Sequence, residues 1–340
     1  MARYQWIVAG SIILLTTACT PVIETIQVTD ADSDGLPRHN EDILVSSEIT
    51  VKSGGAGTPV ASVRPAYPPT GPYQQMGTLP NKVSLGDNRY RYSGETSGLN
   101  YGGYDLRLTV DYTAWLTRQS VSAFKPFLVE APSACFAFDV PGPLDFSLGP
   151  VKKSNGDAFG TANLAWRPQN WPIDGERHGS VSFQVLRNQF PGPDQEAHYW
   201  FVDFISAALT DRPGWAASDG VTFRAATRAS GIYVQPIFLI RDPEDGELHY
   251  WAPRDEATGK YQLYPIGEPA ESQLQWKVIR WSSALPAGTR EAVYIRVYGD
   301  AQLTTLNTDE TIYLDGVCPR PPGIDPAGGV VVESVDNPWL

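Results

Sequence analysis

The chain has 340 residues, a net charge of −12 and only 19% charged residues. This charge balance argues against nucleic acid as the main partner, because such proteins need clustered positive charge. The 42% hydrophobic content is enough for a core, and 31 glycines, 29 prolines and 11% aromatic residues favour many short strands joined by turns. We therefore expect an all-β protein that does not bind nucleic acid.

The first predicted element is a secretory signal peptide over residues 1–18. A single positive charge, Arg3, precedes an apolar run over residues 7–15 that is too short to span a bilayer comfortably. The segment that follows, Leu15-Thr16-Thr17-Ala18-Cys19, resembles the lipobox of bacterial lipoproteins. The resemblance implies that Cys19 is lipidated and anchors the mature chain to the outer membrane or cell surface of a bacterium. An ordinary signal peptide or an uncleaved anchor is the alternative.

The next segment, residues 19–82, has the composition of a linker. Residues 20–80 contain no Trp, no Phe and only two Tyr, and they include runs rich in Gly and Pro. Such a segment buries too little apolar surface to offset the entropy of an ordered chain. We therefore predict a disordered, flexible tether over residues 19–82. A C-terminal tail over residues 321–340 has the same character.

A metal-binding pattern lies inside the predicted tether, over residues 30–41. Oxygen ligands occupy the first, third, fifth and twelfth positions, a glycine occupies the sixth, and a backbone carbonyl is available at the seventh. The pattern resembles the calcium loops of EF-hands and of thrombospondin type 3 repeats, and it predicts a Ca²⁺ site. The alternative is a solvated acidic linker. The predicted ligands are Asp30, Asp32, Asp34, Leu36 and Glu41.

From residue 83 onward the chain shows the pattern of β-strands. In Tyr104–Tyr112 every second residue is apolar or aromatic, which is typical of a strand with one buried face. Turn sequences rich in Pro, Gly and Asp separate the later runs, and this favours a sandwich or barrel over residues 83–320. The other expected strands are 134–140, 179–187, 198–205, 220–226, 231–240, 248–251, 275–282, 291–298 and 311–318.

The order of these strands suggests a family. Ser218–Arg224 introduces a middle strand, Gln275–Trp281 precedes an alternating strand, and the last strand reads Tyr313-Leu314-Asp315. The series resembles the galactose-binding-like jelly rolls of many carbohydrate-binding modules, over about residues 130–320. The resemblance implies a jelly-roll β-sandwich, with residues 83–130 as an extra hairpin on it.

The cysteine count fits an exported protein. If Cys19 carries lipid, Cys135 and Cys318 remain as a pair in an oxidising compartment, and we predict that they form a disulfide. The bridge would close a loop of about 183 residues and stabilise the fold by about 5 kcal/mol in the loop-entropy treatment. Two buried free thiols are the alternative.

Sugar recognition by such a fold needs aromatic rings and polar side chains together on one face. Alternation places Tyr294, Arg296 and Tyr298 on one side of their strand, and Tyr233 and Gln235 on one side of another. A second buried face, or a face covered by the hairpin, is the alternative. The predicted carbohydrate-binding residues are Arg224, Tyr233, Gln235, Tyr294, Arg296 and Tyr298.

The sequence carries no strong motif for catalysis. It has no Gly-x-Ser-x-Gly elbow and no His-Glu-x-x-His helix, and its four histidines are scattered, so we assign no catalytic residue. We favour a surface-anchored envelope lipoprotein that binds a glycan without cleaving it. The alternatives are a structural or adhesive envelope protein that binds other proteins, and a polysaccharide-cleaving enzyme.

Overall fold

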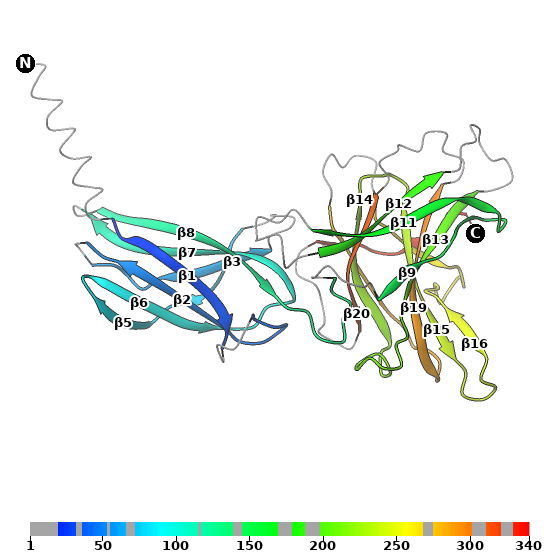
Figure 1. The fold of residues 1–340 in the computed structure, drawn as a ribbon, viewed down its shortest axis with the longest axis horizontal. Coiled ribbons are helices and arrows are strands. Elements are labelled where there is room, and N and C mark those ends of the chain that lie inside the picture. Colours follow the sequence, from blue (N-terminus) through cyan, green and yellow to red (C-terminus); the bar gives the residue numbers. More distant parts are fainter. Residues whose placement is uncertain are drawn as a thin grey trace, which may run out of the picture. The chain divides into compact units, whose positions relative to one another are not determined.

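Two all-β units make up the described part of the chain (Figure 1). The computed structural model describes residues 20–31, 36–52, 55–65, 72–114, 117–138, 145–168, 179–187, 198–267, 275–300, 311–320 and 329–339. The units divide between Glu130 and Ala131. In these residues every regular element is a strand, so the predicted all-β class is confirmed. None of them forms a helix long and apolar enough to cross a membrane.

The first unit is a sandwich of two four-stranded antiparallel sheets. One sheet has the order β1-β2-β6-β5 and the other β4-β3-β7-β8. These are the orders A-B-E-D and C′-C-F-G of an immunoglobulin-like sandwich when the strands are lettered along the chain. The strands are β1 (Val22–Asp30), β2 (Ile43–Thr50), β3 (Val60–Pro65), β4 (Gln74–Thr78), β5 (Asn81–Gly86), β6 (Arg89–Thr96), β7 (Gly102–Ala114) and β8 (Thr117–Val129).

Alternation along β2 and β7 builds the core between these two sheets. Ile43, Val45 and Ile49 are fully buried on β2, and the predicted apolar face of Tyr104–Tyr112 on β7 is buried as expected. The hydroxyl of Tyr104 donates a hydrogen bond of 2.9 Å to the carbonyl oxygen of Asn100, just before β7 begins. A tyrosine that bonds back in this way near the start of strand F is the tyrosine corner of immunoglobulin-like sandwiches.

The predicted tether over residues 19–82 is wrong for most of its length. Strands β1 to β4, and the start of β5, lie within it and form part of the first unit. Small β-branched residues that point inward at every second position supply the apolar surface that we expected from Trp and Phe. The segment 83–130 likewise completes this unit and is not a hairpin of the second one.

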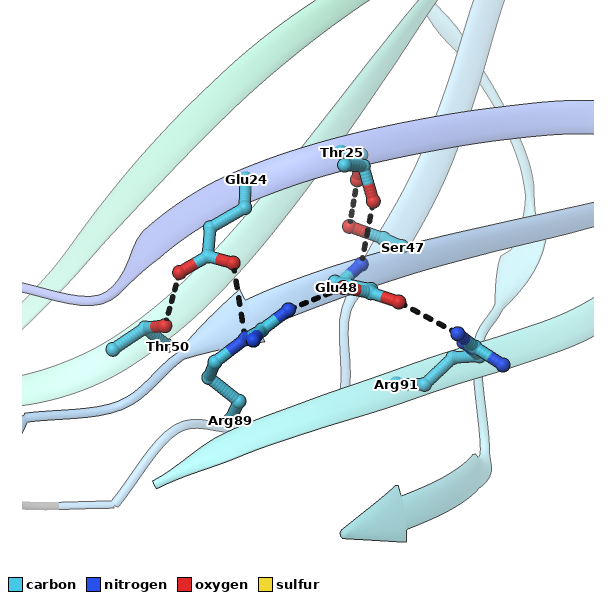
Figure 2. Close-up of polar contacts among 7 residues, drawn as sticks. All are labelled: Glu24, Thr25, Ser47, Glu48, Thr50, Arg89 and Arg91. Atoms are coloured by element: carbon cyan, nitrogen blue, oxygen red, sulfur yellow. Dashed lines mark hydrogen bonds and ion pairs between the residues drawn. The ribbon is translucent and has the colours of Figure 1, made fainter. Parts of the chain in front are cut away.

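Charged side chains cover the outward side of the sheet β1-β2-β6 (Figure 2). Glu48 on β2 accepts bonds from Arg91 at 2.6 Å and Arg89 at 2.8 Å, and Glu24 on β1 lies 3.3 Å from Arg89. Hydrogen bonds from Arg91 and Arg89 lower the pKa of Glu48 from its usual value. We call these four residues the charged ladder.

The second unit is a jelly roll. Its eight main strands follow one another as β12, β13, β14, β15, β17, β18, β19 and β20. One layer has the order β12-β20-β14-β18 and the other β13-β19-β15-β17. When the eight strands are numbered in chain order, layer one has the order 1-8-3-6 and layer two the order 2-7-4-5. This is the strand order of a jelly roll, so the predicted jelly-roll sandwich is confirmed. The bounds are β12 (Gly179–Arg187), β13 (Tyr199–Ser206), β14 (Gly220–Thr227), β15 (Tyr233–Arg241), β17 (Gln262–Pro265), β18 (Lys277–Ser282), β19 (Thr289–Asp300) and β20 (Thr311–Pro319).

Four additional strands extend the layers of the second unit or bridge them. β10 bridges the layers because it pairs with both β11 and β13, while β9 and β16 add to the edges of layer two. Side chains from both layers form one core cluster, with Phe183 and Phe223 from layer one and Phe204, Phe238 and Val297 from layer two. The additional strands are β9 (Phe146–Leu148), β10 (Val151–Lys153), β11 (Ala158–Pro168) and β16 (Leu248–Trp251).

The predicted disulfide between Cys135 and Cys318 is present. Cys318 lies near the end of β20. Cys135 lies in a bend beside the isolated bridge between Phe136 and Val317, whereas we had expected a strand over 134–140. The bond therefore ties the start of the second unit to its last main strand.

The C-terminal tail, residues 329–339, is ordered, which corrects the prediction of a linker-like tail for this part of 321–340. β21 (Val330–Val331) pairs in parallel with β18, and β22 (Val335–Asp336) pairs antiparallel with β17. The tail thus lies against an outer strand of each layer and satisfies backbone groups that an edge would leave free.

Candidate functional site

Three rows of side chains cross the outward side of layer two. The register aligns β13, β19 and β15, and alternation sends one set of residues into the core and the other set outward. The inward set includes Trp200, Ile295 and Phe238. We call the outward set the aromatic face. Its rows are Phe201–Tyr298–Tyr233, Asp203–Arg296–Gln235 and Ile205–Tyr294–Ile237.

An ion pair lies in the middle row. Arg296 donates from Nε to Oδ1 of Asp203 at 2.6 Å and from Nη2 to Oδ2 at 2.9 Å, and its guanidinium lies over the ring of Phe201 at 4.5 Å. Burial disfavours the charge of Arg296, but the bonds to Asp203 outweigh it and hold the pKa above its usual value. The pair is a rigid, charged and partly exposed group set among rings.

Two members of the aromatic face are already satisfied by the protein. Tyr298 donates a 2.8 Å hydrogen bond to Oε1 of Gln235, and Nε2 of Gln235 donates to the carbonyl oxygen of Gln262 at 3.2 Å. Tyr298 is 5% exposed and Gln235 is 2% exposed. Burial raises the pKa of Tyr298 to about 12. These two residues support the face from beneath.

A ring from the C-terminal tail lies on the aromatic face. Trp339 stacks on Tyr298 at 6.2 Å between ring centroids, meets Tyr233 edge-on at 5.5 Å, and contacts Tyr199 of β13 at 5.4 Å. We did not predict this residue, because nothing in the local sequence shows that the tail returns to this face. Its aromatic character so close to the C-terminus was the available signal.

The aromatic face continues onto the β15–β16 hairpin. Tyr294 meets Tyr250 edge-on at 5.6 Å, and burial together with the hydrogen bond between the Tyr294 and Tyr250 side chains raises the pKa of Tyr294 to about 12. Tyr250 itself is 63% exposed. Five of the six predicted sugar-binding residues therefore lie together: Tyr233, Gln235, Tyr294, Arg296 and Tyr298.

Arg224, the sixth predicted residue, does not belong to this face. It lies on β14 in layer one, is 2% exposed and pairs with Asp315 on β20. Its guanidinium also lies over the ring of Trp276 at 5.6 Å. Neighbouring residues of a strand point to opposite sides, so Arg224 lies opposite Phe223, but both sides of β14 are buried. The prediction of Arg224 as a surface ligand is therefore wrong.

The predicted calcium loop connects β1 to β2. Asp30 ends β1 and is buried, Leu36 is partly buried, and Glu41 accepts a hydrogen bond at 3.2 Å from the backbone N–H of Arg38. Asp32 and Asp34 lie outside the described residues, as does the predicted lipidation site Cys19. Calcium at this loop stays a prediction.

A second group of metal-type ligands lies in the β15–β16 hairpin. Within the described chain, ligand atoms of Asp242, Asp245 and His249 lie within 4.8 Å of one another. Asp242 and His249 also line a cavity of about 220 Å³, together with Trp251 and Pro286. The group could accept a divalent cation, since aspartate oxygens and imidazole nitrogens are common ligands.

Comparisons with known proteins leave the family open. No family model matches the chain, and no curated protein matches it. The N-terminal CBM22-1-CBM22-2 tandem domain of Paenibacillus barcinonensis Xyn10C aligns at 11% identity with a TM-score of 0.30, over 88% of this chain and 92% of that one. An exo-beta-agarase aligns at 9% identity with a TM-score of 0.28, over 56% of this chain and 26% of that one. The secreted serine protease VesC of Vibrio cholerae aligns at 9% with a TM-score of 0.24, over 92% and 53%. Likeness this weak carries no argument about function.

Proposed function

We propose that the second unit binds a carbohydrate on the aromatic face without cleaving it. The observation that carries the proposal is the set of rows in which Tyr and Phe rings flank the fixed pair Asp203–Arg296. Rings offer flat apolar area to the C–H side of a sugar ring, and a fixed ion pair offers donors and acceptors to its hydroxyls. Arg296 has five N–H donors, of which Asp203 uses two.

The proposal includes export and anchoring. A disulfide between Cys135 and Cys318 suits an oxidising compartment outside the cytoplasm. Together with the lipobox-like segment, it supports a lipoprotein of the bacterial cell envelope that is attached through Cys19. Calcium at the β1–β2 loop is part of the same proposal and would belong to the first unit.

Binding to polysaccharides tests the proposal directly. The chain without residues 1–18, with Cys19→Ser to avoid lipidation, is incubated with cellulose, xylan, chitin, mannan and peptidoglycan. We expect one of these to retain it, and Tyr294→Ala or Arg296→Lys to weaken retention about tenfold, a loss of about 1.4 kcal/mol. Phe124→Ala, which removes an exposed ring of the first unit, is the matched control.

Two results would overturn the proposal: retention by none of the polymers, or equal retention of all variants.

One observation favours the adhesive alternative. Leu248, Tyr250 and Trp251 on β16 are exposed apolar side chains on one short strand. Such a patch suits a protein partner. Self-association that Trp251→Ala abolishes, without glycan binding, would support that alternative.

A further inference from the structure

The position of Trp339 deepens the proposed function. The tyrosine beneath it, Tyr298, is buried, and its hydroxyl donates a hydrogen bond to the side chain of Gln235. The side-chain amide of Gln235 in turn donates a hydrogen bond to the backbone carbonyl oxygen of Gln262. Both side chains are almost fully buried, so a ligand on this face has little access to their polar atoms. A sugar that approaches this end of the face therefore meets Trp339 first.

Trp339 is held in a defined orientation. Its ring lies nearly parallel to that of Tyr298, at an interplanar angle of 28°, and it meets Tyr233 almost perpendicularly at 85°. Tyr199 contacts it at 38°. Three tyrosines from β13, β15 and β19 thus support one indole ring, which stays partly exposed. A preformed ring binds better than a mobile one, because the entropy of ordering it is already spent.

The tail is fixed to layer two just before this ring. Nε2 of Gln262 donates to Oδ1 of Asp336 at 2.7 Å, and the N–H of Asn337 donates to the carbonyl oxygen of Tyr261 at 2.9 Å. The side-chain oxygen of the buried Asn337 then accepts a hydrogen bond of 2.9 Å from the backbone N–H of Trp339. These bonds make Asn337 a positioning residue for the indole.

We propose that Trp339 is the ring on which the sugar stacks, so that the glycan site is incomplete without the last residues of the tail. This inference rests on the proposed function. It assigns the stacking role to a residue of the C-terminal tail, while the strands beneath supply support and the pair Asp203–Arg296 supplies the polar contacts.

The test uses the polysaccharide that retains the unaltered protein. We expect Trp339→Ala to weaken binding about tenfold, Trp339→Phe to weaken it less because a flat ring remains, and Asn337→Ala to give an intermediate loss. Phe124→Ala is again the control. Near-ultraviolet circular dichroism and the denaturant midpoint of each variant show whether the second unit stays folded. Soluble oligosaccharide should change the tryptophan emission of the unaltered protein and not that of Trp339→Phe.

Each outcome separates the two proposals. Tighter binding by Trp339→Ala would mean that the tail blocks the face, and unchanged binding would mean that the sugar lies elsewhere; either result overturns the stacking role while the proposed function stands. If the unaltered protein binds no polysaccharide, the proposed function fails and the inference fails with it. A third result also overturns the stacking role. In it, Trp339→Ala loses binding only because the unit unfolds, and Trp339→Phe has the same affinity and the same change in tryptophan emission as the unaltered protein.

Discussion

The two units are both two-layered sandwiches, but they present opposite kinds of surface. On the first unit, the charged ladder is a set of solvent-exposed ion pairs among Glu24, Glu48, Arg89 and Arg91 (Figure 2). On the second, the aromatic face places rings around a single ion pair. Exposed ion pairs are well solvated and need no partner, whereas rings gain free energy when something covers them. The contrast supports the proposal that recognition belongs to the second unit.

The largest expected effect is the loss of the disulfide, which only the second unit contains among the described residues. The double variant Cys135→Ser/Cys318→Ser should lower the free energy of unfolding of that unit by up to about 5 kcal/mol, since the unfolded chain is no longer constrained. Hydrogen exchange read by peptide gives the change for each unit. An equal loss of protection in the first unit would contradict this separation.

The next effect compares a buried ion pair with an exposed one. Asp315→Ala leaves the guanidinium of Arg224 without its carboxylate inside layer one, and we expect a loss of about 3–5 kcal/mol. The double variant Arg224→Met/Asp315→Leu removes both charges and should recover part of that stability. Urea unfolding of the three proteins measures this. A loss in Asp315→Ala no larger than that in Glu48→Gln would refute the comparison.

Alkaline pH should weaken the second unit selectively. Burial raises the pKa of Tyr264, Tyr294 and Tyr298 to about 12, from 10.0 in an unfolded chain. Between these pH values the unfolded chain loses protons that the folded unit keeps. The free energy of unfolding of the second unit is therefore at its full value below pH 10 and falls as the pH approaches 12. Unfolding midpoints across this range, with Tyr298→Phe as a variant that falls less, measure the effect. A midpoint that stays constant would contradict it.

The smallest effect belongs to the charged ladder. The pKa of Glu48 is lowered chiefly by its bonds to Arg91 and Arg89, so their contribution is present at neutral pH and lost as the pH falls below the usual value of 4.5. Glu48→Gln should shift the unfolding midpoint of the first unit only slightly, and added salt should remove the shift. A large shift that persists in high salt would show that the ladder is not merely solvated.

Seven of the eight main strands of the second unit could be predicted because each carries a clear signal, whereas β17 and the additional strands β9, β10 and β11 were not expected. Alternating Val, Ile and aromatic residues mark β13, β15 and β19, and Pro-Gly turns separate them. The same alternation correctly grouped Tyr294, Arg296 and Tyr298. It cannot say which layer a strand joins, and this is why Arg224 was assigned to the wrong surface.

The N-terminal strands of the first unit were harder to predict because the buried aromatic residues of this unit, such as Tyr92, Tyr104 and Phe127, come from the later strands β6, β7 and β8. On β2 the inward residues are Ile43, Val45, Ser47 and Ile49, a spacing of two that was present in the sequence. The lack of Trp and Phe in residues 20–80 favours a linker, but β-branched Ile and Val are enough to cover one side of a core. The place of Trp339 depends on where the tail travels in space, and no local pattern encodes that.

The central position of β20 has a consequence for the order of assembly. This strand pairs with β12 on one side and β14 on the other, yet it is the last main strand to be synthesised. Layer one must therefore remain split, with two open edges, until β20 has been synthesised. The first unit, whose strands are complete by Val129, can fold while that gap persists. A cell that makes this protein must therefore keep the open edges of β12 and β14 from pairing with other strands until β20 is in place.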